Sequence, residues 1–191
     1  ILHHTFYSKT FWNPKFRRPR VATHYDMIPE IFHESRMGIN PHLSKHWYFN
    51  TVSHILSISE SAKTDLNQIW PDVKTPISIT HLGHPDVQHR NLERKKGHII
   101  FVGVRSGYKD AETLLRAFAK LPENLKVKLE FIGGGEFSES EKETIDALGI
   151  RSYVSQRNVT EAELIDAYSK AHAFVFPSKY EGFGLPALEA L

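Results

Sequence analysis

Short apolar runs alternate along this chain with longer segments in which apolar residues recur every three or four positions. A short run predicts a strand, and an amphipathic segment of that spacing predicts a helix. In the second half of the chain, the predicted strands lie at 98–103, 127–132, 152–155 and 172–176. The predicted helices lie at 111–120, 139–148 and 161–170, with a last one from Pro186 onward. Strict alternation of strands and helices is typical of a parallel sheet with helices on both faces.

The first half of the chain repeats this pattern, with predicted strands at 21–25, 54–58 and 77–81. The segment "SISESAKTDLNQIW" after the second of these strands predicts a helix with Ser59 as its N-cap. Between the two halves, "LGHPDVQHRNLERKKG" shows no period and is rich in charges, as linkers are. We therefore predict a first domain at 1–84, an interdomain linker at 85–97 and a second domain at 98–191.

The composition is that of an ordinary globular protein, since 40% of its 191 residues are hydrophobic and can form sizeable cores. Its 24 basic and 22 acidic side chains nearly balance, which gives no reason to expect a nucleic-acid partner. The absence of cysteine excludes disulfides and cysteine-ligated metal and fits a reducing compartment. No apolar run reaches the roughly 18 residues of a membrane span. The start at Ile1 lacks the charged and apolar regions of a signal peptide, so we expect the chain to begin in mid-protein.

Charged and glycine-rich residues gather in the loops that follow the predicted strands of the second half. Open parallel sheets bind ligands at the carboxyl ends of their strands, so these loops are expected to meet at one edge. In "GVRSGYKD", Arg105 and Lys109 stand four residues apart where a loop joins a helix, which suits a phosphate or diphosphate. The alternative is that both are solvated surface charges.

Two glutamates, Glu181 and Glu189, flank a glycine-rich turn in the segment "EGFGLPALE". Gly182 and Gly184 leave backbone amides unshielded ahead of a helix whose first turn accepts Pro186, and such amides form an anion site. Carboxylates beside a diphosphate would repel it, so they must face a neutral group rich in hydroxyls, such as a sugar. The alternative is that Glu189 interacts with the helix dipole and Glu181 is solvated.

The segment "EGFGLPALE" resembles the motif of two glutamates separated by seven residues that marks retaining glycosyltransferases of family four. Three further segments are similar to that family, in the same order along the chain. "VATHYDMIPEIF" resembles its acceptor-side loop, "ILSISESAKTDL" the segment before its linker, and "FVGVRSGYKDAETLLRAFA" its phosphate-binding segment. The resemblance covers nearly the whole chain. It implies the GT-B fold, an α/β fold of two Rossmann-like domains with parallel sheets, both incomplete in this chain.

The resemblance also implies a role for each matching residue. Glu181 would hold hydroxyls of the transferred hexose, and Glu189 would bind the ribose hydroxyls of the donor. Lys109 and Arg105 would neutralise the departing nucleoside diphosphate, so that neither a metal nor another cofactor is needed. The other donor-binding candidates are Gly103, Gly133, Arg157, Phe183, Gly184 and Leu185.

One departure from the family pattern concerns the two cations. The family often has Arg and Lys five residues apart with Asn after the Lys, whereas here the spacing is four and Asp110 follows. The assignment of Arg105 is therefore weaker than that of Lys109.

A second departure concerns the acceptor-side loop, where many relatives have His directly before Asp. Here Tyr25 precedes Asp26, and His24 stands one residue earlier. Neighbouring strand residues point to opposite faces, so only one of the two can replace that histidine. We assign the catalytic acceptor-side position to Tyr25, with ordinary packing at the strand end as the alternative.

Three further features give weaker signals. His42 and His46 have a zinc-binding spacing on a predicted helix, but no third ligand is near in sequence, so we expect no metal. The segment "KFRRPR" could contact an anionic membrane surface, although a solvated loop is the stronger interpretation. The segment "GGGEF" does not match the dinucleotide fingerprint, and its glycines favour close approach of the backbone to a nucleotide base or ribose.

These observations predict an enzyme that moves a hexose of the mannose or glucose type, with retention, from a nucleotide diphosphate sugar to a sugar or lipid-linked acceptor in cell-surface polysaccharide biosynthesis. The alternatives are a GT-B nucleotide-sugar epimerase and a non-catalytic nucleotide-sugar-binding module. The expected location is the cytoplasm, with peripheral contact at the inner face of the membrane as a further option. Relative to the family, the chain lacks the start of one domain and the end of the other, so we expect these 191 residues alone to bind donor weakly and to transfer nothing.

Overall fold

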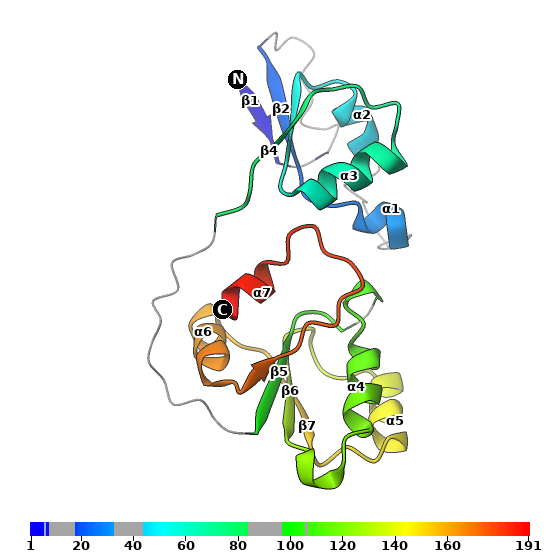
Figure 1. Cartoon of the computed structure of the whole chain (residues 1–191), viewed down its shortest axis with the longest axis vertical. Coiled ribbons are helices and arrows are strands. Elements are labelled where there is room, and N and C mark those ends of the chain that lie inside the picture. Colours follow the sequence, from blue (N-terminus) through cyan, green and yellow to red (C-terminus); the bar gives the residue numbers. More distant parts are fainter. Residues whose placement is uncertain (6, 8–17, 33–43, 84–96, 106) are drawn as a thin grey trace. The chain divides into compact units, whose positions relative to one another are not determined.

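The computed structural model describes residues 1–5, 7, 18–32, 44–83, 97–105 and 107–191 (Figure 1). The chain divides into two compact units, which are described separately. The first unit comprises Ile1–Gly83 with Glu181–Phe183, and the second comprises His84–Tyr180 with Gly184–Leu191. Each unit contains one four-stranded sheet in which neighbouring strands are parallel. The α/β class with parallel sheets, predicted from the alternating pattern, is confirmed. Of the predicted linker at 85–97, only Gly97 lies within the described residues.

The first unit arranges its strands in the order β1-β2-β3-β4. These strands are β1 (Leu2–His4), β2 (Arg20–His24), β3 (His54–Ser57) and β4 (Ile77–Ile79). The helices described in this unit are α1 (Ile28–Phe32), α2 (Lys45–Phe49) and α3 (Glu60–Ile69). The sequence did not predict β1, because a three-residue strand that contains two histidines leaves no apolar run to detect.

Side chains from α2 and α3 pack on one face of this first sheet. The fully buried members of the cluster include Tyr48 and Phe49 of α2, Leu66 of α3, and the neighbours Ala22 and Ile55 of β2 and β3. Burial of these large side chains is the main source of stability for the unit.

The second unit arranges its strands in the order β7-β6-β5-β8. These strands are β5 (His98–Val102), β6 (Lys128–Ile132), β7 (Val154–Arg157) and β8 (Ala173–Phe174). The helices described in this unit are α4 (Ala111–Ala119), α5 (Glu139–Ala147), α6 (Glu161–Lys170) and α7 (Leu185–Glu189), with short 3-10 turns η3 (Gly107–Lys109) and η4 (Glu123–Leu125).

Helices cover both faces of the second sheet, as predicted, with α4 and α5 on one face and α6 on the other (Figure 1). Phe101 and Phe131 pack in one core together with the helices α4 and α5. Ile100 and Ile132, their neighbours in the same strands, pack in a second core with Ala167 of α6. Successive strand residues point to opposite faces, so a continuous apolar run supplies both cores.

Polar caps fix where the helices begin. Ser59 Oγ accepts a hydrogen bond from the Ala62 amide at 3.0 Å, which confirms the predicted N-cap of α3. Helix α5 begins with a capping box between Ser138 and Glu141, and α6 begins with one at Thr160.

The strand predicted at 152–155 is wrong by two residues, since β7 spans Val154–Arg157. The preceding residues form a turn in which the Tyr153 amide donates to the Ile150 carbonyl at 3.0 Å, so the strand begins after this turn. Arg157 therefore lies in the strand and not in the loop that follows it. Other ends also differ from the prediction by one or two residues; for example, β4 ends at Ile79, β8 spans only Ala173–Phe174, and α7 begins at Leu185.

Candidate functional site

The loops that follow β5 and β6 lie side by side at the carboxyl edge of the second sheet. The Gly103 amide donates to the Ile132 carbonyl at 2.9 Å, and the Gly133 amide donates to the Arg157 carbonyl at 3.0 Å. Gly103 and Gly133 have φ values of 125° and 87°, which side chains disfavour. The structure thus brings these two donor-binding candidates together, because a Cβ on Gly133 would lie 3.8 Å from the Gly103 amide nitrogen.

Arg105 lies in the loop after β5, and its side chain extends to the loop after β6. Its side chain is 5% exposed, and its Nε donates to Glu141 Oε1 at 2.7 Å. The guanidinium lies 4.8 Å from the ring centroid of Phe137, within the range of a cation–π interaction. The predicted phosphate ligand therefore has its donors directed at protein acceptors in this structure.

Lys109 ends the turn η3 and is 8% exposed. Its Nζ lies 5.0 Å from the ring centroid of Phe176, and 5.3 Å from that of Tyr108. The Lys179 amide donates to the Tyr108 carbonyl at 2.8 Å. This hydrogen bond joins η3 to the segment after β8, so Lys109 lies beside the chain that leads into "EGFGLPALE".

Asp110, which stands where the family often has Asn, has a left-handed backbone with φ of 51°. Aspartate and asparagine tolerate this conformation better than most residues. The Asp110 carboxylate accepts a hydrogen bond from Thr113 Oγ1 at 2.9 Å and lies 3.4 Å from Lys179 Nζ. An asparagine could keep the backbone conformation, but only aspartate provides the ion pair with Lys179.

Glu189 lies in α7 and contacts a tyrosine from α6. Tyr168 Oη donates to Glu189 Oε2 at 3.3 Å. Burial, followed by the charge of Glu189, raises the pKa of Tyr168 above its usual value. The phenol therefore remains a hydrogen-bond donor to this carboxylate at neutral pH. The sequence did not predict this contact, because the two residues lie on different helices.

Glu181 and Phe183 are grouped with the first unit, whereas Gly184, Leu185 and Glu189 are grouped with the second. Gly184 precedes α7 with φ of 83°, a conformation that favours glycine at this position. Because the glutamates of the predicted motif fall in different units, a joint site that contains both stays a prediction.

Arg157, another donor-binding candidate, pairs with a carboxylate on the neighbouring strand. Its Nε donates to Glu130 Oε1 at 3.0 Å, and a second nitrogen donates to Oε2 at 3.3 Å. His98 Nε2 also lies 3.4 Å from Glu130. The structure therefore places Arg157 in a charged cluster across β5, β6 and β7, and its contact with the donor stays a prediction.

His24 is the last residue of β2, whereas Tyr25 follows the strand that was predicted to include it, and the two differ in burial. His24 is fully buried, and its ring centroid lies 5.3 Å from that of Phe49. Its Nε2 donates to the Asp26 carbonyl at 3.1 Å, which fixes the proton on that nitrogen. Tyr25 is half-buried. His24 is thus a core residue of the first unit, and Tyr25 stays the acceptor-side candidate.

Lys45 is a buried cation that the sequence interpretation missed. Its side chain is 1% exposed, and its Nζ donates to the Asp26 carbonyl at 2.7 Å and to Glu30 Oε2 at 2.9 Å. Burial lowers the pKa of Lys45, while Glu30 acts in the opposite direction. The spacing in the sequence indicates this burial. Lys45 stands three residues before Tyr48 and four before Phe49, so the three side chains share one face of α2, which is buried. The contact fixes the backbone directly after Tyr25.

We expect the free energy of unfolding to fall as the pH drops below 6.5, because of His24. Burial, followed by the charge of Lys45, lowers the pKa of this histidine from 6.5 to about 3. Between these two values, the unfolded chain binds a proton that the folded chain excludes. Acidification therefore favours the unfolded state, by up to about 1.4 kcal/mol per pH unit. Denaturant unfolding from neutral pH down to about pH 4 measures this slope.

His24→Gln is the matched control for this pH dependence. The amide side chain keeps a donor near the Asp26 carbonyl but does not titrate. The variant should lose stability less steeply on acidification than the unmodified protein. Equal slopes for both proteins would mean that His24 is not the source.

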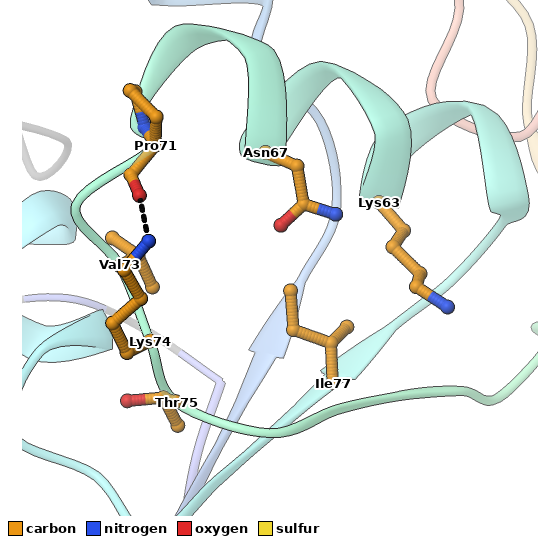
Figure 2. Close-up of a pocket in the computed structure, with 7 residues that line it drawn as sticks. All are labelled: Lys63, Asn67, Pro71, Val73, Lys74, Thr75 and Ile77. Carbon is orange, nitrogen blue, oxygen red and sulfur yellow. Dashed lines mark hydrogen bonds between the residues drawn. The ribbon is translucent and has the colours of Figure 1, made fainter.

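Two cavities bear on where a ligand could bind. One, of about 540 Å³, lies beside α3 on the first unit. Figure 2 shows its lining: Lys63, Asn67, Pro71, Val73, Lys74, Thr75 and Ile77. None of the residues predicted from the sequence lines it, and Lys74 Nζ donates to the Pro71 carbonyl at 2.7 Å. The other cavity, of about 480 Å³, lies on the second unit, and Arg105, Gly134 and Glu141 contribute to its lining. Among the predicted site residues, all of which the structure describes, Arg105 is the one that lines the second cavity.

Within the described part of the chain, no group of three or more His, Asp or Glu side chains is arranged to hold a metal ion. His42 lies outside that part, and His46 Nε2 lies 2.8 Å from Asp72 Oδ2. The first three residues of "KFRRPR" also lie outside it. Across the same described residues, no helix combines the length and the apolar character needed to cross a bilayer.

The chain has two α/β units, each with a sheet of parallel strands. The second unit carries glycine-rich loops and Lys109 at the carboxyl edge of its sheet. These features define a protein of the Rossmann-like α/β class. Residues 86–191 match the family model described as glycosyl transferases group 1. The chain belongs to this family.

Curated relatives agree with this assignment. The chain is 34% identical over 153 residues to the uncharacterized glycosyltransferase MJ1607 of Methanocaldococcus jannaschii, a match that covers 72% of this chain and 39% of the relative. It is 25% identical over 210 residues to O-antigen chain mannosyltransferase B of Escherichia coli, with 97% of this chain and 54% of the relative covered. The chain therefore spans about half, or less, of the length of these relatives.

Several solved structures share the fold. The crystal structure of TarM matches with a TM-score of 0.71 at 15% identity, over 95% of this chain and 36% of TarM. WaaG, described as a glycosyltransferase involved in lipopolysaccharide biosynthesis, matches with a TM-score of 0.65 at 18% identity, over 93% of this chain and 57% of WaaG. Anabaena HepE, solved in complex with UDP and glucose, matches with a TM-score of 0.69 at 19% identity, over 91% of this chain and 50% of HepE. The expected GT-B type of fold is confirmed.

Proposed function

We propose that the protein is a retaining glycosyltransferase of family four, with "EGFGLPALE" as its motif of two glutamates separated by seven residues. It moves a hexose of the mannose or glucose type from a nucleotide diphosphate sugar to a sugar or lipid-linked acceptor, in cell-surface polysaccharide biosynthesis. Membership of the glycosyl transferases group 1 family supports the reaction class. The named mannosyltransferase of Escherichia coli supports the hexose, and the complex of HepE with UDP and glucose supports the kind of donor.

The observation that carries this proposal is the position of Lys109. The hydrogen bond of 2.8 Å between the Lys179 amide and the Tyr108 carbonyl holds Lys109 beside the segment that enters the glutamate motif. A diphosphate at the carboxyl edge of the sheet would meet this cation. Cleavage of the bond between the anomeric carbon and the phosphate oxygen leaves negative charge on the nucleoside diphosphate. A cation at this position stabilises that charge in the transition state.

The remaining roles follow from the resemblance. Glu181 holds hydroxyls of the hexose, and the backbone of Phe183, Gly184 and Leu185 meets the sugar and the diphosphate. Glu189 accepts hydrogen bonds from the ribose hydroxyls, with Tyr168 holding one of its oxygens at 3.3 Å. Lys109 provides the charge stabilisation, and in this proposal the reaction uses no metal and no cofactor. The cytoplasm and peripheral contact with the inner face of the membrane are also part of the proposal.

A donor screen tests the proposal. Calorimetry on the purified full-length protein against common GDP and UDP sugars should identify one donor that binds clearly more tightly than the rest. The matching nucleoside diphosphate should compete with it. No binding of any GDP or UDP sugar would contradict the proposed function.

Glu189→Gln should weaken binding of the nucleoside diphosphate by about 1 to 3 kcal/mol, the usual cost of disturbing a hydrogen bond to a charged group. The change removes the negative charge of the carboxylate, which accepts hydrogen bonds from the ribose hydroxyls in this proposal. Glu143→Gln, an exposed position on α5, is the matched control and should have no effect. Unchanged affinity of the Glu189 variant for both GDP and UDP would contradict the ribose assignment.

A further inference from the structure

The guanidinium of Arg105 is fully engaged by the protein. It donates through all three of its nitrogens to the Gly133, Gly134, Gly135 and Glu136 carbonyls, at 2.9, 3.5, 3.0 and 2.8 Å, and to the two Glu141 carboxylate oxygens, at 2.7 and 3.3 Å. Arginine has five N–H donors in a fixed planar arrangement, and this set of acceptors uses that arrangement. Lysine could not reproduce these contacts.

The acceptors belong to a loop that needs a fixed partner. Gly133, Gly134 and Gly135 all have positive φ, of 87°, 73° and 74°. Glycine loses more conformational freedom on folding than any other residue. Ordering a loop with three consecutive glycines therefore costs much conformational entropy. A Cβ on Gly134 would lie 2.9 Å from an Arg105 nitrogen and 3.0 Å from the Gly103 carbonyl oxygen. The glycines thus let the loop close around the guanidinium.

Glu141 holds the other side of the guanidinium. Its Oε2 also accepts a hydrogen bond of 2.7 Å from the Ser138 amide, in the capping box that starts α5. Burial alone would raise the pKa of Glu141, but the hydrogen bonds from Arg105 and Ser138 outweigh burial and lower the pKa. The carboxylate is therefore charged at neutral pH and balances the charge of Arg105.

We propose that Arg105 is a positioning residue, which with Glu141 fixes the loop Gly133–Glu136 as part of the nucleoside site and does not bind the diphosphate. This inference rests on the proposed function. All three guanidinium nitrogens of Arg105 already donate to protein acceptors, and the side chain is 5% exposed. The carboxylate of Glu141 balances its positive charge, so little attraction is left for a phosphate. Lys109 is then the cation that faces the diphosphate.

The test compares a nucleoside with its diphosphate, using the base that the donor screen identifies. If Arg105 acts by positioning, Arg105→Gln and Glu141→Gln each weaken binding of both ligands by the same factor, about tenfold, because each disrupts charged hydrogen bonds. The double variant should be no weaker than the worse single variant, since the two residues act as one unit. Arg105→Lys should not restore binding. Lys109→Gln should weaken the diphosphate alone.

The result that would overturn the proposal is selective loss of the diphosphate in Arg105→Gln with Glu141→Gln unchanged, because that is the behaviour of a phosphate ligand. Unchanged binding of both ligands in both variants would also overturn it. Arg116→Gln, an exposed arginine on α4, is the matched control and should bind as the unmodified protein does. Circular dichroism shows whether each variant folds.

Hydrogen exchange of the loop amides supplies a readout that needs no ligand. Arg105→Gln and Glu141→Gln should both speed exchange at Gly133–Glu136 while leaving strand β5 protected. Unchanged exchange in either variant would overturn the positioning role even if no nucleotide bound. If the loop loosens but no GDP or UDP sugar binds the unmodified protein, the proposed function fails and the positioning of the loop stands.

Discussion

Glu181→Ala is expected to slow hexose transfer by about 100-fold or more, the order found when one transition-state hydrogen-bonding group is removed. Affinity for the nucleoside diphosphate should stay the same, because Glu181 is assigned to the sugar and not to the nucleotide. Loss of rate without loss of product affinity is the signature of an interaction made in the transition state. Turnover is measured by release of nucleoside diphosphate, and affinity by calorimetry on the same preparation.

Glu181→Gln separates charge from size at this position. If the carboxylate must accept hydrogen bonds from hexose hydroxyls, the amide should recover part of the rate that alanine loses. Equal loss of turnover and of nucleoside diphosphate binding in Glu181→Ala would show that the residue contacts the nucleotide.

Lys109→Gln is expected to lower the rate of transfer by about 100- to 1,000-fold, with a smaller loss of diphosphate affinity. The asymmetry follows from the reaction, because negative charge on the leaving group is larger in the transition state than in the bound donor. Single-turnover rates and diphosphate affinity measured together give the two effects.

Lys142→Gln is the matched control for this change. It removes the same charge from α5, where the side chain of Lys142 is 40% exposed and its Nζ lies 2.7 Å from Glu139 Oε1. If both lysine variants lose the same small amount of activity, the effect is one of net charge and Lys109 does not stabilise the leaving group.

The architecture could be predicted because it depends on short-range patterns. The apolar run that contains Ile100 and Phe101 marks a strand buried on both faces, and a polar residue before an amphipathic segment marks the start of a helix, as Ser59 does. These signals lie within a few residues of each other. The missed strand Leu2–His4 is too short to carry such a signal, and the early start given to β7 reflects a turn that the apolar pattern does not show.

The contacts of the charged site residues could not be predicted, because their partners are distant in sequence. Arg105 and Glu141 are 36 positions apart, and Lys45 and Glu30 are 15 positions apart. A charged side chain is normally exposed, and only a specific partner makes its burial tolerable. The strand pattern placed Arg105 in the loop after β5, at the carboxyl edge of the sheet, where it lies. It did not predict the glycine loop and the carboxylate that occupy its donors.

The stereochemistry of the product tests the central claim most directly. The purified full-length protein is incubated with the donor found by the screen and a sugar or lipid-linked acceptor, and the product is examined by proton NMR. We predict that nucleoside diphosphate appears only when the acceptor is present, and that the new glycosidic bond has the anomeric configuration of the donor. An inverted product, or a free altered nucleotide sugar formed without acceptor, would contradict the account.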